Sequence, residues 1–181
     1  RMLSPKALAS SLVREEDVNA ADYKVVPPAR VAEQLNAHFP WDPDVGQFFT
    51  LIYGVLDTEA LTFRYVSAGH PGPAVFPCDG EPYIPRSSGM PVGLANEPYD
   101  EHHIQLAPGD RMHLYSDGVT EAMNRKRELF GVPRLLESLG ANGDQPLADC
   151  HDRLMAELEA FRGATRFNDD ISMLSVEVTR R

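Results

Sequence analysis

The sequence predicts an α+β fold built on antiparallel β-sheet. In the middle of the chain, segments of alternating apolar and polar residues are separated by short turns, a pattern typical of hairpins. Segments with helical spacing of apolar residues lie towards the two ends of the sequence. Runs of strands separated from runs of helices favour α+β over alternating β-α units.

Helices are expected in both terminal regions, separated by the strands. Pro27 and Pro28 precede one of them, where proline is favourable in the first turn. A polar, loop-like stretch covers 15–24. The expected helices cover about 1–14, 29–39, one turn from 119, 132–139 and 147–161.

Strands are expected between these helices and at the end of the chain. The first, rich in Phe, Thr, Ile, Tyr and Val, is expected to be well buried and to form a hairpin with the second. The strand over 102–106 is expected to pair with the strand over 111–115 across the turn at 107–110. The expected strands cover 47–56, 61–68, 74–76, about 83–84, 102–106, 111–115 and 171–178.

Length and charge limit the class of protein. A chain of 181 residues is long enough for one domain with a real core. Its net charge of −10 argues against nucleic acid or an anionic membrane as the main partner, because both need a basic surface.

No apolar run approaches the ~20 residues of a membrane helix, and no signal peptide is recognisable. Cys78 and Cys150 form no CxxC motif, so we expect two unrelated thiols in a cytoplasmic protein, with one disulfide as the alternative.

Two acidic clusters lie at strand boundaries far apart in the sequence. Asp117 ends a strand and is followed by Gly118, which lets backbone or an ion approach closely. Asp169 and Asp170 precede the last expected strand. If the two clusters converge, they form a site for a hard cation, because such ions prefer oxygen ligands. The alternatives are an N-cap role for Asp117 and turn chemistry for the Asp pair.

Histidine and serine residues allow further readings. His70, in the loop after Gly69, either faces a substrate or bonds to the backbone. His102 and His103 point to opposite faces of a strand, so with His113 and His151 elsewhere a structural zinc site is disfavoured. A hydrolase triad of Ser116, His70 and Asp169 lacks a GxSxG elbow. No Walker A or GxGxxG motif supports nucleotide binding.

Four motifs in order carry a family resemblance. Together they resemble the SpoIIE-like (RsbU-type) branch of the PPM metal-dependent protein serine/threonine phosphatases, over nearly the whole chain. The motifs are Ser67-Ala68-Gly69-His70-Pro71, Gly89-Met90-Pro91-Val92-Gly93-Leu94, Leu114-Tyr115-Ser116-Asp117-Gly118-Val119-Thr120-Glu121-Ala122 and Asn168-Asp169-Asp170-Ile171-Ser172.

The resemblance implies a four-layer α-β-β-α sandwich of two antiparallel sheets. It implies a dinuclear Mn²⁺ or Mg²⁺ site that activates a water to hydrolyse phosphoserine or phosphothreonine. Asp117 and Asp169 would be metal ligands, and Asp170 a ligand or a supporting group. A substrate-side position is implied for Gly69, His70 and Gly118, without a firm catalytic role.

One family segment is absent. Members usually carry an Asp-x-x-Gly-His-Gly run, with a further metal-binding Asp, ahead of a helix that corresponds to the start of this chain. Arg1-Met2 is not a natural start, so we expect residues 1–181 to be a single SpoIIE-like domain that lacks its first strands. Such a fragment is expected to bind metal poorly and to have little or no activity.

Partners follow by analogy with the family. The substrate would be a phosphorylated protein, an anti-sigma-factor antagonist in a bacterial partner-switching pathway. A sensor or receiver domain would precede this domain in the parent chain, and a homodimer could form through the first helix. Two other classes remain open: a non-catalytic regulatory module of the same fold that binds a signalling partner, and a metal-independent hydrolase that uses Ser116 and His70.

Overall fold

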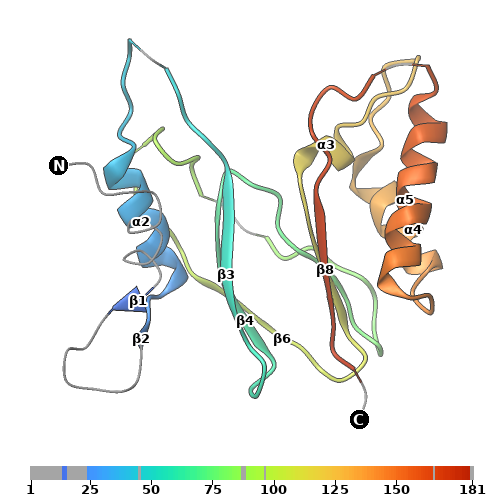
Figure 1. Ribbon diagram of the computed structural model, residues 1–181, viewed down its shortest axis with the longest axis horizontal. Helices are drawn as coiled ribbons and strands as arrows, with labels where there is room; N and C mark the ends of the chain where they lie inside the picture. The colour runs from blue at the N-terminus through green and yellow to red at the C-terminus, as the bar shows by residue number, and fades with distance from the viewer. Residues whose placement is uncertain are drawn as a thin grey trace. The chain divides into compact units, whose positions relative to one another are not determined.

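The computed structural model describes residues 14–15, 24–44, 46–86, 89–95, 97–164 and 166–179 (Figure 1). Its contacts divide the chain into two compact units. The first unit holds Arg1–His70 and Ser87–Ile104, and the second holds Pro71–Arg86 and Gln105–Arg181. No helix among the described residues is long and apolar enough to cross a membrane.

The first unit is a helix packed on a three-stranded antiparallel sheet. Its strands lie in the order β3-β4-β6, and a separate two-residue pair joins β1 and β2. Helix α2 packs against β3 and β4, and their apolar side chains form the core of this unit. The elements are β1 (Arg14–Glu15), β2 (Lys24–Val25), α2 (Pro28–His38), β3 (Leu51–Asp57), β4 (Thr62–Ala68) and β6 (His102–Gln105).

The β3–β4 hairpin closes through a side chain. Its register runs from Leu51 opposite Ala68 to Asp57 opposite Thr62. One carboxylate oxygen of Asp57 accepts hydrogen bonds from the backbone N–H groups of Glu59 and Ala60, at 3.0 and 2.8 Å. These bonds to the charged form lower the pKa of Asp57 and hold the turn in place.

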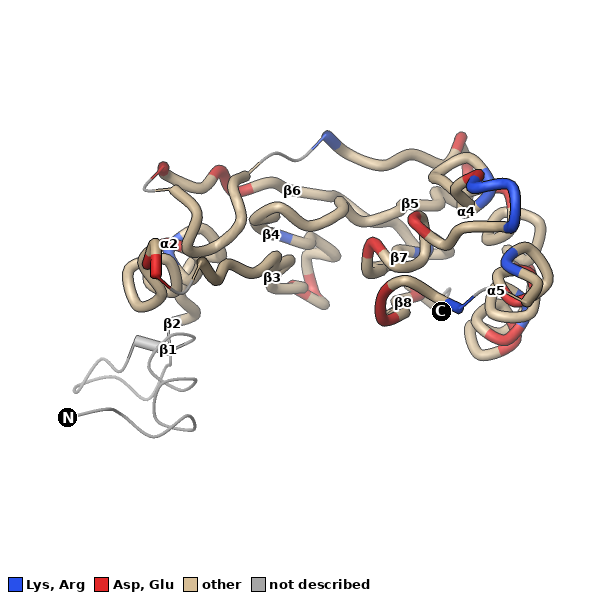
Figure 2. Tube along the Cα trace, turned by 90° about the horizontal axis from the view of Figure 1, so that it is seen from above, with Lys and Arg blue, Asp and Glu red and all other residues tan. Residues whose placement is uncertain are grey.

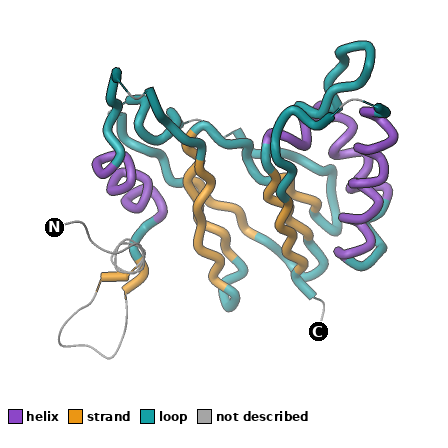
Figure 3. Tube along the Cα trace, turned by 45° about the horizontal axis from the view of Figure 1, so that its top comes forward, coloured by secondary structure: helices purple, strands orange, loops and turns teal. Residues whose placement is uncertain are grey.

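The second unit is a three-stranded antiparallel sheet with helices. Its strands lie in the order β5-β7-β8, and α4 and α5 run beside them (Figure 3). Leu135, Leu154 and Leu158 of these helices join Ala74 and Tyr115 of the sheet in one buried cluster. The elements are β5 (Ala74–Phe76), β7 (Arg111–Tyr115), α3 (Asp117–Thr120), α4 (Gly131–Ala141), α5 (Leu147–Arg162) and β8 (Met173–Glu177).

Most of the expected elements are confirmed. The two antiparallel sheets with helices make an α+β fold, and α2, α4 and α5 begin and end close to their predicted limits. Strands β5 and β7 have the predicted bounds, and β3 and β4 form the predicted hairpin. Cys78 and Cys150 are both free thiols, as expected. The helix expected over about 1–14 lies outside the described residues, except for Arg14, which belongs to β1.

Three predictions about single segments are wrong. The loop expected over 15–24 contributes a residue to β1 at one end and to β2 at the other. The first long strand begins at Leu51, and the side chains from Leu51 to Leu56 are half-buried because β3 is the outer strand in its sheet order. The strand expected near Tyr83 is reduced to a single bridge with Val75.

The predicted pairing of 102–106 with 111–115 is also wrong. Strand β6 pairs with β4 in one sheet, while β7 lies between β5 and β8 in the other. The turn before β7 extends the β7–β8 pairing, since Gly109 N–H bonds to Val178 O at 2.6 Å and Val178 N–H to Asp110 O at 2.9 Å. The buried Asp110 carboxylate also accepts hydrogen bonds from Cys78 and Ala107 N–H groups, which ties this turn to the end of β5.

Candidate functional site

Strand β7 delivers Asp117 to the first turn of a short helix. The buried Tyr115 ends β7, and burial raises the pKa of its phenol to about 12, so the group is neutral. Helix α3 begins at Asp117, whose backbone carbonyl accepts hydrogen bonds from Glu121 N–H at 2.8 Å and Thr120 Oγ1 at 3.2 Å. The backbone around the half-buried Asp117 is thus held by a strand on one side and a helical turn on the other.

Antiparallel pairing brings the second acidic cluster to the same place. Tyr115 at the end of β7 lies opposite Met173 at the start of β8. The residues after β7 therefore lie beside the residues before β8, which include Asp169 and Asp170. The predicted convergence of the two acidic segments follows from this register, although they are about fifty residues apart in the sequence.

Ser116 fastens the two segments together. Its backbone N–H donates to Ser172 O at 3.0 Å, and its hydroxyl accepts from Ser172 N–H at 2.9 Å. The same hydroxyl donates to Asp170 O, also at 2.9 Å. Because the hydroxyl proton is engaged by a carbonyl, Ser116 serves as a structural clamp. This arrangement argues against the triad in which Ser116 would be a nucleophile.

Gly118 allows the two segments to touch. A Cβ atom built on Gly118 would lie 2.4 Å from Asp170 O and 3.3 Å from Asp169 O. Any side chain here would push the acidic segment away from α3. A glycine is therefore needed at position 118, because the backbone of α3 lies against the backbone of Asp169 and Asp170.

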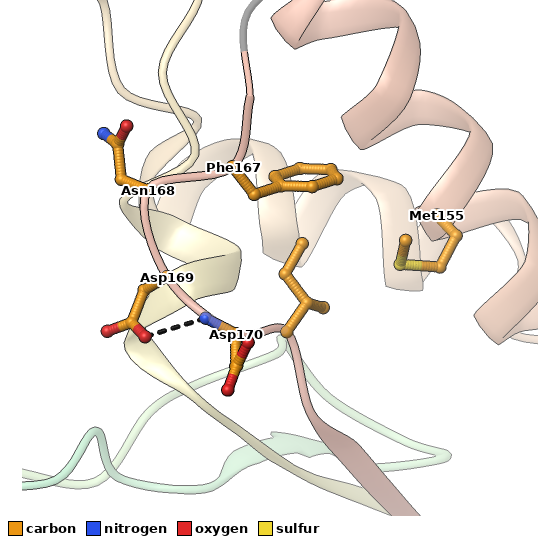
Figure 4. A pocket seen from close by; sticks show the side chains of 6 residues that line it. Met155, Phe167, Asn168, Asp169 and Asp170 are labelled. Atoms are coloured by element: carbon orange, nitrogen blue, oxygen red, sulfur yellow. Dashed lines mark hydrogen bonds between the residues drawn. The ribbon is translucent and has the colours of Figure 1, made fainter.

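The carboxylates of the Asp pair are exposed and differ in their bonding. Asp170 N–H donates to one Asp169 oxygen at 2.7 Å (Figure 4). That bond orients the Asp169 carboxylate and leaves its second oxygen for another ligand. Asp170 is held through its backbone carbonyl by Ser116, as described above.

These residues fit a hard cation, but as an incomplete ligand set. Carboxylate oxygens are the ligands that Mg²⁺ and Mn²⁺ prefer, and Mg²⁺ is often held by one or two carboxylates while keeping several waters. Across the described ranges, no three His, Cys, Asp or Glu side chains gather closely enough to hold a metal ion by themselves. Asp117 and Asp169 can therefore anchor a cation only if water, substrate or further ligands complete its coordination.

Gly69 and His70 lie in the other compact unit, and within it they have structural contacts. Gly69 has a φ of +68°, and a Cβ there would lie 2.6 Å from Pro91 Cγ. Its N–H bonds to Gly89 O at 2.7 Å, and the hydroxyl of Ser67 donates to His70 O. These contacts account for the loop conformation. The substrate-side position of Gly69, His70 and Gly118 stays a prediction.

Sequence reasoning missed a second polar cluster, in which two histidines share one serine. Ser175 Oγ lies 2.6 Å from His113 Nδ1 and 2.6 Å from His151 Nε2. Burial, followed by the positive charges of His151 and Arg111, lowers the pKa of His113 to about 4. His113 lies opposite Ser175 in the β7–β8 register, and this register, which the local sequence pattern does not contain, is what brings the pair together.

Comparison with known proteins agrees with this fold. Residues 5–179 match the family described as Stage II sporulation protein E (SpoIIE). Protein IcfG of Synechocystis sp. (strain ATCC 27184 / PCC 6803 / Kazusa) is 33% identical over 135 residues, which cover 74% of this chain and 21% of IcfG. Phosphoserine phosphatase RsbU of Bacillus subtilis (strain 168) is 26% identical over 175 residues, which cover 94% of this chain and 50% of RsbU. The chain thus spans half or less of these curated relatives.

Solved structures show the same architecture. The SiaA-PP2C domain of Pseudomonas aeruginosa superposes with a TM-score of 0.74 at 19% identity, covering 83% of this chain and 61% of that domain. The phosphatase domain of the cell fate determinant SpoIIE from Bacillus subtilis, presoaked with Mn, has a TM-score of 0.64 at 15% identity. The match covers 100% of this chain and 76% of that chain. The predicted PPM-type fold is confirmed by these neighbours. With a family match over residues 5–179, this chain belongs to the family described as Stage II sporulation protein E (SpoIIE).

Proposed function

We propose that this chain is the phosphatase domain of a bacterial signalling protein that hydrolyses phosphoserine or phosphothreonine with the help of divalent cations, and that residues 1–181 by themselves bind metal poorly and have little or no activity. The observation that supports the proposal is the clamp between Ser116 and the 170–172 segment, which joins the backbone next to Asp117 to the backbone next to Asp169. The names of the relatives and the metal-soaked SpoIIE structure support the reaction type and the metal requirement.

The chain's own residues would prepare the site for this reaction. Asp117, on the fixed start of α3, and Asp169, oriented by Asp170 N–H, would hold Mn²⁺ or Mg²⁺. Bound there, a pair of such ions would polarise the phosphoryl oxygens and acidify a water. Asp170 would support the pair as a further ligand or through its charge. Ser116 is engaged as a clamp, so we expect direct attack by water and no phosphoserine intermediate on the protein.

The wider context belongs to the same proposal. We propose that the substrate is a phosphorylated signalling protein of the anti-sigma-factor antagonist type, and that a sensor or receiver domain controls this domain in the parent protein. A cytoplasmic location fits the two free thiols, of which Cys78 is exposed. The choice between Mn²⁺ and Mg²⁺, a dinuclear site and a homodimer are parts of the proposal that need direct measurement.

The first test is metal binding by the parent-length protein, measured by calorimetry with Mn²⁺. Asp117→Asn and Asp169→Asn should each weaken binding by about tenfold or more, because each removes a charged oxygen ligand. The control is Asp152→Asn on α5, a helix that carries exposed acids along its length (Figure 2). Equal losses in all three variants would mean that Mn²⁺ follows overall negative charge and would contradict the site.

The second test is phosphate release from a phosphoserine peptide by the parent-length protein with Mn²⁺ present. We expect release that EDTA abolishes and that Asp117→Asn strongly reduces. Metal binding without release from any phosphopeptide would favour the alternative of a non-catalytic module. Release that is indifferent to EDTA would overturn the metal mechanism.

A further inference from the structure

A hollow of about 390 Å³ opens beside the acidic segment of the candidate site (Figure 4). This volume is at the lower end of the range for small-ligand pockets, so it can take one or two residues of a peptide. The hollow lies within the second unit. Its lining residues are Met155, Phe167, Asn168, Asp169, Asp170 and Ile171.

The lining has an apolar part and an acidic part. Met155 of α5, Phe167 and Ile171 are half-buried and pack against the core of the second unit. In Figure 4, the side chains of Phe167 and Met155 lie on one side of the view, and the carboxylates of Asp169 and Asp170 on the other. A ligand that fills the hollow must therefore touch apolar side chains at one end and reach the carboxylates at the other.

We propose that this hollow is a subsite for an apolar side chain adjacent to the phosphorylated serine or threonine of the substrate. The inference rests on the proposed function, because Asp169 is both a proposed cation ligand and part of the lining. With the phosphate at the cations, the Cα atom of the neighbouring peptide residue lies about 3.8 Å from the Cα atom of the phosphorylated residue. Its side chain then faces Met155, Phe167 and Ile171.

The charges around the hollow favour an apolar occupant over a charged one. The guanidinium of Arg162 lies over the Phe167 ring at 4.6 Å, which places a positive charge at this wall. Together with cations at Asp169, this charge disfavours lysine or arginine in the hollow. An acidic side chain would lose hydration against Met155 and Ile171. A side chain of the size of leucine, isoleucine or methionine gains by leaving water.

The test uses matched phosphoserine peptides that differ only at the two residues flanking the phosphoserine. With Mn²⁺, the parent-length protein should hydrolyse the leucine-flanked peptide with a kcat/KM about tenfold higher than the alanine-flanked one. Met155→Asp should remove this preference, and hydrolysis of p-nitrophenyl phosphate, which has no flanking residue, reports separately on the metal site. Met155→Leu should retain the preference.

A matched control introduces the same charge on the neighbouring helix. Val132 is 39% exposed in the first turn of α4 and does not line the hollow, so Val132→Asp should retain the preference. Equal rates for the two peptides with the wild-type chain, or an unchanged preference in Met155→Asp, would overturn the subsite. Failure to hydrolyse either peptide or p-nitrophenyl phosphate would instead count against the proposed function, and the subsite would fall with it.

Binding can be followed without catalysis. In a sample with ¹³C-labelled methionine methyl groups and Mg²⁺, a leucine-flanked peptide carrying a non-hydrolysable phosphonate in place of phosphoserine should shift the Met155 signal. The alanine-flanked phosphonate peptide should shift it much less. Equal shifts of the Met155 signal with both peptides would contradict an apolar subsite, whatever the activity of the chain.

Discussion

Two small residues, Ser116 and Gly118, bring the acidic segments of the candidate site into contact. Ser116 joins them with three hydrogen bonds through one backbone N–H and one hydroxyl. Gly118 gives the space that Asp170 O occupies. Neither residue carries the proposed chemistry, but both set where Asp117 and Asp169 lie. A substitution at either residue should therefore weaken metal binding indirectly, by displacing Asp117 or Asp169.

Gly118→Ala tests this geometry. Its Cβ would meet Asp170 O at 2.4 Å, so the acidic segment must move. We expect a loss of about 1–3 kcal/mol in the free energy of unfolding, measured with urea, and weaker Mn²⁺ binding by calorimetry.

Gly140→Ala in α4 is the matched control. The nearest atom to its added Cβ is Phe76 Cε1 at 3.6 Å, an ordinary contact. This variant should bind Mn²⁺ normally and be up to about 1 kcal/mol more stable, since alanine favours the helix. Normal Mn²⁺ binding and stability in Gly118→Ala would show that the two segments need not touch.

At the scale of elements, Ser175 of β8 links β7 to α5. Its hydroxyl contacts both His113 of β7 and His151 of α5. Close by, Arg111 of β7 forms an ion pair with Glu177 of β8 at 2.8 Å, and its guanidinium lies 3.5 Å from the Cys150 sulfur. This polar cluster fixes how α5 lies on the sheet. Helix α5 in turn precedes the acidic segment and supplies Met155 to the hollow.

The buried His113 should make stability depend on pH. Its pKa is about 4 in the folded chain, compared with the ordinary value of 6.5. Between these values the unfolded chain binds more protons, so stability should fall as the pH is lowered from 6.5 to 4. The cost is about 3 kcal/mol over this window. Urea unfolding at several pH values from 4 to 7 measures it.

His113→Gln should flatten this pH profile, because glutamine can still bond to Ser175 but does not titrate. The control is His103→Gln. The side chain of His103 on β6 is 59% exposed, so its replacement should change the pH dependence of stability little. If His113→Gln and the wild-type chain lose the same stability between pH 6.5 and 4, burial of His113 is not the cause.

At the scale of the whole molecule, the two compact units are interleaved in the sequence. The chain passes from one unit to the other after His70, after Arg86 and after Ile104, within strand β6. Neither unit is a continuous segment of the chain. If one unit unfolded alone, parts of it would become long loops whose ends are still held by the other, folded unit, which limits the conformational entropy that they gain. We therefore expect the units to unfold together, as the prediction of a single domain requires.

Leu158→Ala tests this cooperativity. Leu158 is fully buried in the core of the second unit, and its truncation should cost about 2–5 kcal/mol. Hydrogen exchange should then accelerate by the same factor in β4 of the first unit and β7 of the second. Leu129→Ala, at a side chain that is 48% exposed, should change neither. Faster exchange confined to β7 would mean two separate domains.

The sequence by itself determined the local elements and the positions of the candidate site residues. The β3–β4 hairpin, the bounds of β5 and the three longer described helices follow from apolar spacing and turn residues, because these act between near neighbours. The same patterns placed Asp117 after one strand and Asp169 before another. The family motifs then indicated the PPM fold and the kind of chemistry.

The tertiary structure alone decided which strands pair and what surrounds the site. Local patterning made β6 and β7 look like a hairpin, but the contacts of Asp110 and Gly109 with Cys78 and Val178 place β7 between β5 and β8. The Ser175 cluster and the hollow at Met155 likewise join residues from separate elements. Such contacts depend on the register of distant segments, and a pattern that extends over only a few residues contains no information about that register.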